Sequence, residues 1–349
     1  MNQAASRRGT VRVAAIDCGT NSLRLLIADV NPLRAELTDL VRRMEIVRLG
    51  QGVDANGRLA ADALDRTFRM LTEYADAIES TSAQAVRMVA TSAIRDAGNA
   101  AEFIRGVSRI LGVAPEVLSG DEEARLAFTG ATAEFATGRD GADGRGEAAR
   151  RDNVPAPGKV RLVPPYLVTD IGGGSTEFVV GDTGTGTPDQ LAAISVDIGC
   201  VRLTERHLHS DPPLAAEIES ATADIDAALA AVARTIPVAS ARTLVGLAGS
   251  VTTVTAIALG LDAYDPARIH HARIPAGLVS AVTAKLLRLS HAQRASISVL
   301  HPGRVDVIGA GAMVLNRTLQ NFGFSEVVAS EHDILDGIAW SLAGSGTAP

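Results

Sequence analysis

Two short stretches of this sequence share one pattern, AIDCGTNS at residues 15–22 and VTDIGGGS at residues 168–175. They match at Asp, Gly and Ser, and Asp17 and Asp170 are 153 positions apart (170 − 17). In both copies one apolar run precedes the loop and another follows it, as expected for two strands joined by a turn. The repeat predicts an α/β protein with two similar halves that face each other across a cleft, each carrying one such hairpin.

The periodicity of apolar residues predicts the elements around the two hairpins. Leu64, Phe68, Leu71, Ala75 and Ile78 step by three or four residues, which is typical of a helix with one apolar face. Residues 138–158 show no periodicity, and we interpret them as a flexible surface insertion. The other predicted elements are strands at 11–16, 23–30, 85–90, 166–169 and 177–180, helices at 60–80, 100–111 and after Pro213, and a strand, turn and buried helix within 244–261.

Composition excludes several classes of protein. A chain of 349 residues with 46% hydrophobic and 21% charged residues is typical of a soluble globular protein of about two domains. A net charge of −7 and 7 Phe, 3 Tyr and 1 Trp do not favour nucleic-acid binding. Because we find neither an export signal nor a membrane span, we expect a cytoplasmic protein without a membrane partner. We interpret Cys18 and Cys200 as free thiols.

The two hairpin loops are the candidate phosphate-binding elements. Successive backbone N–H groups in such a turn form a nest for anionic oxygens, and glycine allows a phosphate to approach closely. Arg95 follows a predicted strand, where its guanidinium could hold phosphate oxygens in a bidentate manner. The alternatives are tight turns without a ligand and a surface arginine without a role. The candidate phosphate-binding residues are Asp17, Gly19, Thr20, Asn21, Ser22, Arg95, Gly172, Gly173, Gly174 and Ser175.

Carboxylates at the two ends of the second hairpin are the candidate metal ligands. Asp170 and Glu177 can both point into the cleft and offer oxygen atoms to Mg²⁺ or Mn²⁺. Hard cations of this kind bind through one or two carboxylates together with substrate phosphate. The alternative for Glu177 is a solvated strand residue.

Two adjacent glutamates at the start of a predicted helix have different expected roles. Ser119 with Glu122 three residues later fits a capping box, in which Glu122 is structural. Glu123 is then the candidate catalytic base, because a place in the first turn of a helix favours its ionised form. The alternative is that Glu123 pairs with Arg95 or Arg125.

The histidines do not predict a zinc site. His270 and His271 are adjacent, and His207 and His209 are close in sequence, but both pairs lack further ligands at the usual spacing. We interpret them as surface or groove residues.

From Val13 to Trp340 the sequence resembles the exopolyphosphatase and guanosine pentaphosphate phosphohydrolase (Ppx/GppA) family of the actin-like ATPase superfamily. The resemblance implies two actin-like (ribonuclease H-like) domains, residues 1–125 with 330–349 and residues 126–329, and a last helix that crosses back to the first domain. It implies Glu123 as the base, Asp170 and Glu177 as ligands of a divalent metal, and a homodimer. The motifs that carry it are residues 17–22, 90–95, 119–126, 170–177, 246–250 and 302–311.

The resemblance leads to an expected activity. We expect a metal-dependent exopolyphosphatase that removes the terminal phosphate of inorganic polyphosphate. Three departures from the family pattern are Thr20 in place of serine, Leu335-Asp336-Gly337 near the C-terminus, and an end at Pro349 without the helical domains of the long members. Since those domains help to hold long polymers, we expect short chains to be favoured. The alternatives are a guanosine pentaphosphate phosphohydrolase, a phosphotransferase, and a sensor that binds polyphosphate or an alarmone without turnover.

Overall fold

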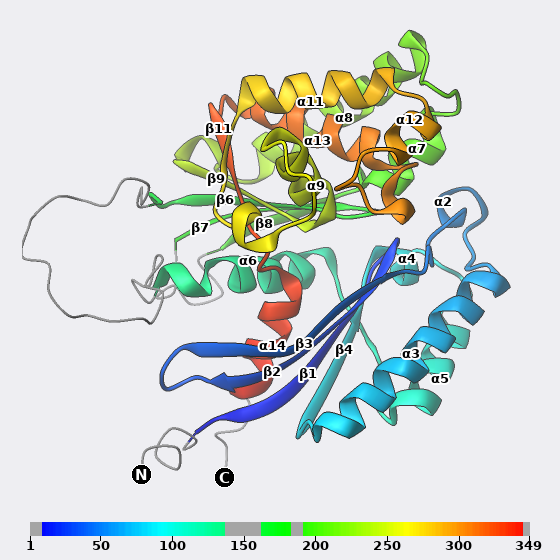
Figure 1. Ribbon diagram of the computed structural model, residues 1–349, viewed down its shortest axis with the longest axis vertical. Coiled ribbons are helices and arrows are strands. Elements are labelled where there is room, and N and C mark those ends of the chain that lie inside the picture. The colour runs from blue at the N-terminus through cyan, green and yellow to red at the C-terminus, as the bar shows by residue number, and fades with distance from the viewer. Residues whose placement is uncertain (1–8, 137–161, 183–190, 345–349) are drawn as a thin grey trace, which may run out of the picture.

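A computed structural model describes residues 9–136, 162–182 and 191–344 of the chain. These residues form two separate β-sheets, each with helices on its outer face. Two further helices lie between the sheets (Figure 1). The predicted insertion at 138–158 lies outside the described residues. No described helix has the length and apolar character needed to cross a membrane.

The N-terminal sheet is built around the first predicted hairpin. Its strand order is β3-β2-β1-β4-β5, with β1 antiparallel to β2 and parallel to β4. Asp17 on β1 faces Arg24 on β2 in the register of the hairpin. The strands are β1 (Val11–Cys18), β2 (Ser22–Asn31), β3 (Glu36–Ile46), β4 (Ala85–Ala90) and β5 (Glu116–Val117).

The C-terminal sheet repeats this arrangement around the second hairpin. Its strand order is β10-β11-β9-β6-β7-β8, with β6 antiparallel to β7 and parallel to β9. Asp170 on β6 faces Glu177 on β7, so the register of the first hairpin recurs. The strands are β6 (Tyr166–Ile171), β7 (Thr176–Gly181), β8 (Ala192–Val196), β9 (Thr243–Leu247), β10 (Arg273–Pro275) and β11 (Glu326–Ala329).

Helices cover the outer faces of the two sheets. On the N-terminal sheet, α3 (Ala61–Thr81) and α5 (Ala100–Leu111) bury apolar residues against β1, β2 and β4. On the C-terminal sheet the outer helices share a second core with β6, β7 and β9. These helices include α7 (Cys200–His207), α8 (Ala215–Thr235), α9 (Ala248–Ala258), α11 (Ala276–Arg288) and α13 (Ile308–Phe322). The short helices are α2 (Val53–Asn56), α4 (Ser92–Arg95), α10 (Pro266–Ile269) and α12 (His291–Ala295), with 3-10 turns η2 (Val238–Ser240) and η3 (Pro302–Arg304).

Helices α6 (Gly120–Ala136) and α14 (Ile334–Gly344) lie between the sheets and share a third core with residues of both (Figure 1). Their backbones cross closely at two glycines. A Cβ atom at Gly130 would lie 1.7 Å from the backbone oxygen of Asp333, and one at Gly337 would lie 2.0 Å from that of Leu126. Helix α14 also packs on β1, β2 and β4 of the N-terminal sheet, and the assignment of residues 330–349 to the first domain stays a prediction.

Most predicted elements are present, and β4 and α5 have the predicted bounds. Strand β3 is missing from the predictions because it is largely solvent-facing and rich in charged residues. Arg95, predicted in a loop, ends the one-turn helix α4. Helix α6 runs through residues 125 and 126, and the proposed domain boundary there stays a prediction. Cys18 and Cys200 are free, as predicted, and both are buried.

Candidate active site

The two repeated hairpin loops touch each other at the centre of the molecule. A Cβ atom at Gly173 would lie 2.9 Å from the Thr20 Cβ, and one at Gly174 would lie 2.7 Å from the Thr20 Oγ1. Thr20 Oγ1 is also 2.9 Å from the Oγ of Ser92, the first residue of α4. Glycine at 173 and 174 is therefore required by space, because a side chain would separate the loops.

Hydrogen bonds to the carbonyl groups orient the second loop. Its Gly172 and Gly173 oxygens accept hydrogen bonds from the N–H groups of Cys200 (2.9 Å) and Val201 (2.8 Å) at the start of α7. In a planar trans peptide the N–H of the next residue points the opposite way from the carbonyl. The N–H groups of Gly173 and Gly174 are thereby directed away from α7, which leaves them available for an anion.

The first loop is held in the same manner. The Asn21 oxygen accepts hydrogen bonds from the N–H groups of Val47 (3.1 Å) and Arg48 (2.9 Å), and the Thr20 oxygen accepts one from Gly50 (2.8 Å). In both loops the turn is closed by equivalent hydrogen bonds, Gly19 N–H to Ser22 O at 3.0 Å and Gly172 N–H to Ser175 O at 3.1 Å. The structure thus contains the predicted pair of facing loops.

The start of α6 places Glu123 against these loops. The predicted capping box is confirmed, since Ser119 N–H donates to Glu122 Oε2 at 2.9 Å and Glu122 N–H donates to Ser119 Oγ at 3.3 Å. Glu123 is 9% exposed, and its Oε2 lies 3.4 Å from Nη1 of Arg95. The pairing with Arg95 that the sequence left open is therefore present. Arg95 also donates to the Leu118 oxygen at 2.8 Å, so it anchors the residue before the cap.

Burial and mutual repulsion shift the titration of three carboxylates. Burial, together with the charges of Glu177 and Asp17, raises the pKa of Glu123 well above its ordinary value, while Arg95 lowers it. Burial, then the charge of Glu177, raises the pKa of Asp170 well above its ordinary value. Burial raises the pKa of Glu177 to about 7, although hydrogen bonds from Ser175 and Ser195 lower it. Desolvation therefore opposes the preference for the ionised form that the helix start gives Glu123.

Arg24 is a central residue that the sequence analysis missed. Its Nε and Nη2 donate to Asp17 Oδ2 at 2.9 and 2.7 Å, and its Nη1 pairs with Asp333 at the start of α14. Both carboxylates are buried, and their charges favour the charged form of Arg24. The repeat contained a signal for this residue, because Arg24 occupies the hairpin position that Glu177 occupies in the second half.

A narrow pocket of about 80 Å³ opens between the two loops and the start of α6. Of the predicted site residues, Gly174, Arg95 and Glu177 do not line it: Arg95 faces Glu123, and Glu177 accepts a hydrogen bond from Ser195 at 2.8 Å. The predicted residues that line it are Asp17, Gly19, Thr20, Asn21, Ser22, Glu123, Asp170, Gly172, Gly173 and Ser175. The lining residues that the analysis did not assign include Arg24, Ser92, Gly249, Ser250 and Arg304.

A second pocket of about 530 Å³ adjoins the first, and Arg24, Gly249 and Arg304 line both. Its other walls combine basic, aromatic and apolar side chains. Among them are Arg42, Arg43, Tyr264, Leu300 and Pro302.

The carboxylates in and beside the first pocket fit a divalent cation. Asp17, Glu123, Asp170 and Glu177 are all buried, and Asp17 Oδ1 has no hydrogen-bond partner among the described residues. Three guanidinium groups, those of Arg24, Arg95 and Arg304, stand there against five carboxylates when Asp333, the second partner of Arg24, is included. Oxygen donors with excess negative charge are what Mg²⁺ and Mn²⁺ require.

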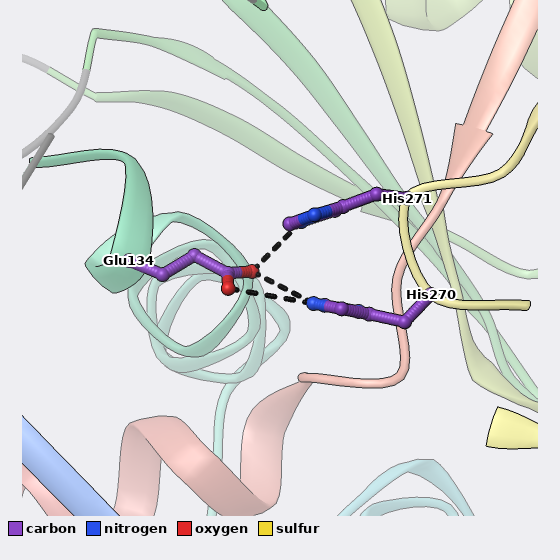
Figure 2. Close-up of side chains that lie close together, drawn as sticks. All are labelled: Glu134, His270 and His271. Carbon is purple, nitrogen blue, oxygen red and sulfur yellow. Dashed lines mark hydrogen bonds and ion pairs between the residues drawn. The ribbon is translucent and has the colours of Figure 1, made fainter. Parts of the chain in front are cut away.

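The interpretation of His270 and His271 as residues without further ligands is wrong. Glu134 on α6 lies within hydrogen-bond distance of both rings, and the three residues could hold a metal ion (Figure 2). The spacing in sequence hid the group, because Glu134 is 136 residues from His270. His207 instead pairs with Asp224 at 3.0 Å.

Comparison with known proteins assigns this architecture. The sequence matches the model of the Ppx/GppA phosphatase family over residues 26–141 and 163–345. It is 46% identical over 344 residues to exopolyphosphatase 2 of Mycobacterium tuberculosis, an alignment that covers 95% of this chain and 99% of that protein.

Two solved structures are similar along nearly the whole chain. An exopolyphosphatase-like protein from a structural genomics consortium has a TM-score of 0.83 and 41% identity, covering 96% of this chain and 99% of its own. The Ppx/GppA family member from Aquifex aeolicus has a TM-score of 0.74 and 28% identity, covering 97% of this chain and 100% of its own.

The two facing sheets with a pocket between their hairpins are those of an actin-like hydrolase, and the predicted α/β fold class is confirmed. The chain belongs to the Ppx/GppA phosphatase family.

Proposed function

We propose that this protein is an exopolyphosphatase that hydrolyses the terminal phosphoric anhydride bond of inorganic polyphosphate. The observation that carries the proposal is the position of Glu123, buried at the wall of a narrow pocket whose opposite walls are the two phosphate-type loops. The name of the relative from Mycobacterium tuberculosis supports the same substrate. The second pocket would then hold the next phosphates of the chain, close to Arg24 and Arg304.

In the proposed reaction a water molecule attacks the terminal phosphorus in line with the bond to the chain. Glu123 accepts the proton of that water, the new P–O bond forms, and the old bond breaks. The chain leaves one unit shorter with the bonding electron pair on its oxygen, and orthophosphate is the other product. The N–H groups of the two loops hold the terminal phosphoryl oxygens in place throughout.

Arg95 acts in this scheme as a positioning residue. Its contacts with Leu118 and Glu123 hold the carboxylate toward the pocket. Burial raises the pKa of Glu123, and the charge of Arg95 lowers it. Arg95 therefore favours the ionised form of Glu123 that a base requires.

Asp170 and Glu177 are the proposed ligands of a Mg²⁺ or Mn²⁺ ion. When bound, such an ion would stabilise negative charge on the phosphoryl oxygens. The raised pKa values of both carboxylates support this assignment, because their charges lack compensation in the protein alone.

Guanosine pentaphosphate is the second candidate substrate. A volume of about 530 Å³ lies in the range that holds a small ligand, and the side chains of Tyr264, Leu300 and Pro302 offer a surface for a base. The preference for short polyphosphate and the homodimer that the resemblance implies stay predictions.

The test is release of orthophosphate in the presence of Mg²⁺ from short polyphosphate, long polyphosphate, guanosine pentaphosphate and ATP. We expect polyphosphate to be the preferred substrate and the Glu123→Gln variant to lose about 10²-fold or more of the turnover. Preference for guanosine pentaphosphate would select the second candidate. Binding without release from any substrate would support a sensor instead.

The neighbouring glutamate provides a matched control. Glu122→Gln retains a capping group at the same helix start and should keep nearly full turnover. Equal losses in the two variants would contradict the assignment of Glu123 as the base.

A further inference from the structure

A carboxylate near the end of α6 is surrounded by imidazoles from two loops. Figure 2 shows Glu134 pointing toward His270 and His271, which lie between α10 and β10. His332, between β11 and α14, approaches the same carboxylate. Glu134 is 11 residues after Glu123 (134 − 123), which is about 16 Å along a helix, and it lines neither pocket described above.

We infer that Glu134, His270 and His271 form a second metal site that takes a transition-metal dication such as Zn²⁺. Imidazole nitrogen with one carboxylate oxygen is a donor set suited to zinc and its neighbours rather than to Mg²⁺. The inferred site is therefore chemically distinct from the all-oxygen site of Asp170 and Glu177.

The distances agree with tetrahedral coordination. Glu134 Oε1 lies 2.9 Å from Nε2 of His271 and 3.2 Å from Nε2 of His270. Metal–ligand distances of about 2.0–2.1 Å give a tetrahedron with edges of about 3.3–3.4 Å. Two edges of the donor triangle are therefore close to those of a tetrahedron. The His270 and His271 rings are stacked with centroids 3.8 Å apart, so one ring must turn before both Nε2 atoms can share the ion.

The surroundings allow an ion to enter and complete its coordination. The side chains of His270, His271 and Glu134 are 22%, 32% and 25% exposed, so the group is neither sealed nor on an open surface. Nδ1 of His332 lies 3.5 Å from Glu134 Oε1. A fourth ligand can come from His332 or from water.

Metal binding requires a change of tautomer at His270. Its Nδ1 accepts a hydrogen bond from the Glu331 N–H at 3.2 Å, so Nε2 of the neutral ring carries the proton that faces Glu134. An imidazole that binds an ion through Nε2 carries its proton on Nδ1. The Glu331 N–H must then lose its hydrogen bond to His270 Nδ1. The NMR signal of this amide therefore reports metal binding.

The ion would join three segments that meet between the sheets. Glu134 belongs to α6, His270 and His271 precede β10, and His332 precedes Asp333, which pairs with Arg24. Binding should therefore stabilise the packing of α6 against the loop that leads into β10, and also against the segment before α14 when His332 is the fourth ligand.

The test is a Zn²⁺ titration of the full untagged chain near pH 7.5 with Mg²⁺ in large excess to occupy the oxygen site. We expect one Zn²⁺ per chain by elemental analysis, and the visible spectrum of tetrahedral Co²⁺ when Co²⁺ replaces Zn²⁺. Glu134→Gln and His271→Ala should each weaken binding by at least about tenfold and abolish the spectrum. His209→Ala removes an exposed histidine elsewhere and should bind as the parent does.

Two further measurements separate a metal site from a hydrogen-bonded histidine cluster. Zn²⁺ should raise the Tm of the parent but not of Glu134→Gln, and it should shift the amide NMR signal of Glu331. Equal Zn²⁺ binding by the parent and by Glu134→Gln, or an unchanged Glu331 signal at saturation, would overturn the proposal. Phosphate release does not enter this test, so its outcome is independent of the proposed activity.

Discussion

Arg24 and Glu177 occupy equivalent positions in the two repeated hairpins, 153 residues apart (177 − 24). Arg24 faces Asp17 across the first hairpin and forms an ion pair with it, whereas Glu177 faces Asp170 across the second and repels it. The same hairpin therefore places Asp17 next to a cation in the first half and Asp170 next to a second carboxylate in the other half. This asymmetry is the reason for proposing the cation ligands on the second hairpin rather than on the first.

The raised pKa values predict a pH dependence of stability. At pH values between the ordinary pKa of a glutamate and the value of about 7 for Glu177, the folded protein holds a proton on Glu177 that the unfolded chain does not hold. The free energy of unfolding of the metal-free protein should therefore fall as the pH rises from about 5 to about 8. Glu177 alone contributes at most on the order of 3 kcal/mol to this loss.

Urea unfolding at several pH values in a chelating buffer measures this effect. Millimolar Mg²⁺ should flatten the decline, because a bound cation favours the ionised carboxylates. A free energy of unfolding that rises with pH in the chelating buffer would contradict the raised pKa values.

Replacement of Arg24 should destabilise the fold. Arg24→Gln leaves Asp17 and Asp333 buried without their cation, and breaking a buried pair of this kind costs about 3–5 kcal/mol. Chemical denaturation at pH 7 gives the value. As a control, Arg66→Gln removes a partner of the largely exposed Asp62 and a hydrogen bond to the Val47 oxygen, and should cost about 1 kcal/mol. Similar losses in the two variants would argue against a special role for Arg24.

A methyl group at Gly174 should separate the two loops. The added Cβ would lie 2.5 Å from the Ser92 Oγ and 2.7 Å from the Thr20 Oγ1. The hydrogen bond between these two hydroxyl groups must therefore break, or the loops must move apart. We expect Gly174→Ala to lower kcat by about tenfold or more, because displacement of positioning groups by about 1 Å is costly. Gly277→Ala on α11 is the control, since its Cβ meets nothing within 4 Å. Full turnover by Gly174→Ala would show that loop contact is not needed.

The crossing of α6 and α14 should tolerate no side chain at Gly337. A Cβ there would lie 2.0 Å from the backbone oxygen of Leu126, which cannot move without shifting α6. We expect Gly337→Ala to lower the free energy of unfolding by about 3 kcal/mol or more. Since Glu123 is on the same helix, phosphate release should fall as well. An unchanged Tm would indicate that the helices can part at no cost.

The sequence predicted the features that depend on neighbours in the chain. The two hairpins, the capping box of Ser119 and Glu122, and the bounds of β4 and α5 follow from local patterns of apolar residues, glycine and hydrogen-bonding side chains. These elements form wherever such a pattern can bury one face, so a few residues contain the necessary information. The candidate base Glu123 could be proposed in the same way, because its neighbour is used as the cap.

Only the tertiary structure decided which distant groups share a surface. Arg24 pairs with Asp333 across 309 positions, and Glu134 meets His270 across 136. Burial and the charge of Glu177 also raise the pKa of Glu123, an effect that its place at the helix start does not reveal. Such contacts and charges arise from the packing of α6 and α14 between the two sheets, and long-range packing leaves no pattern in the spacing of residues.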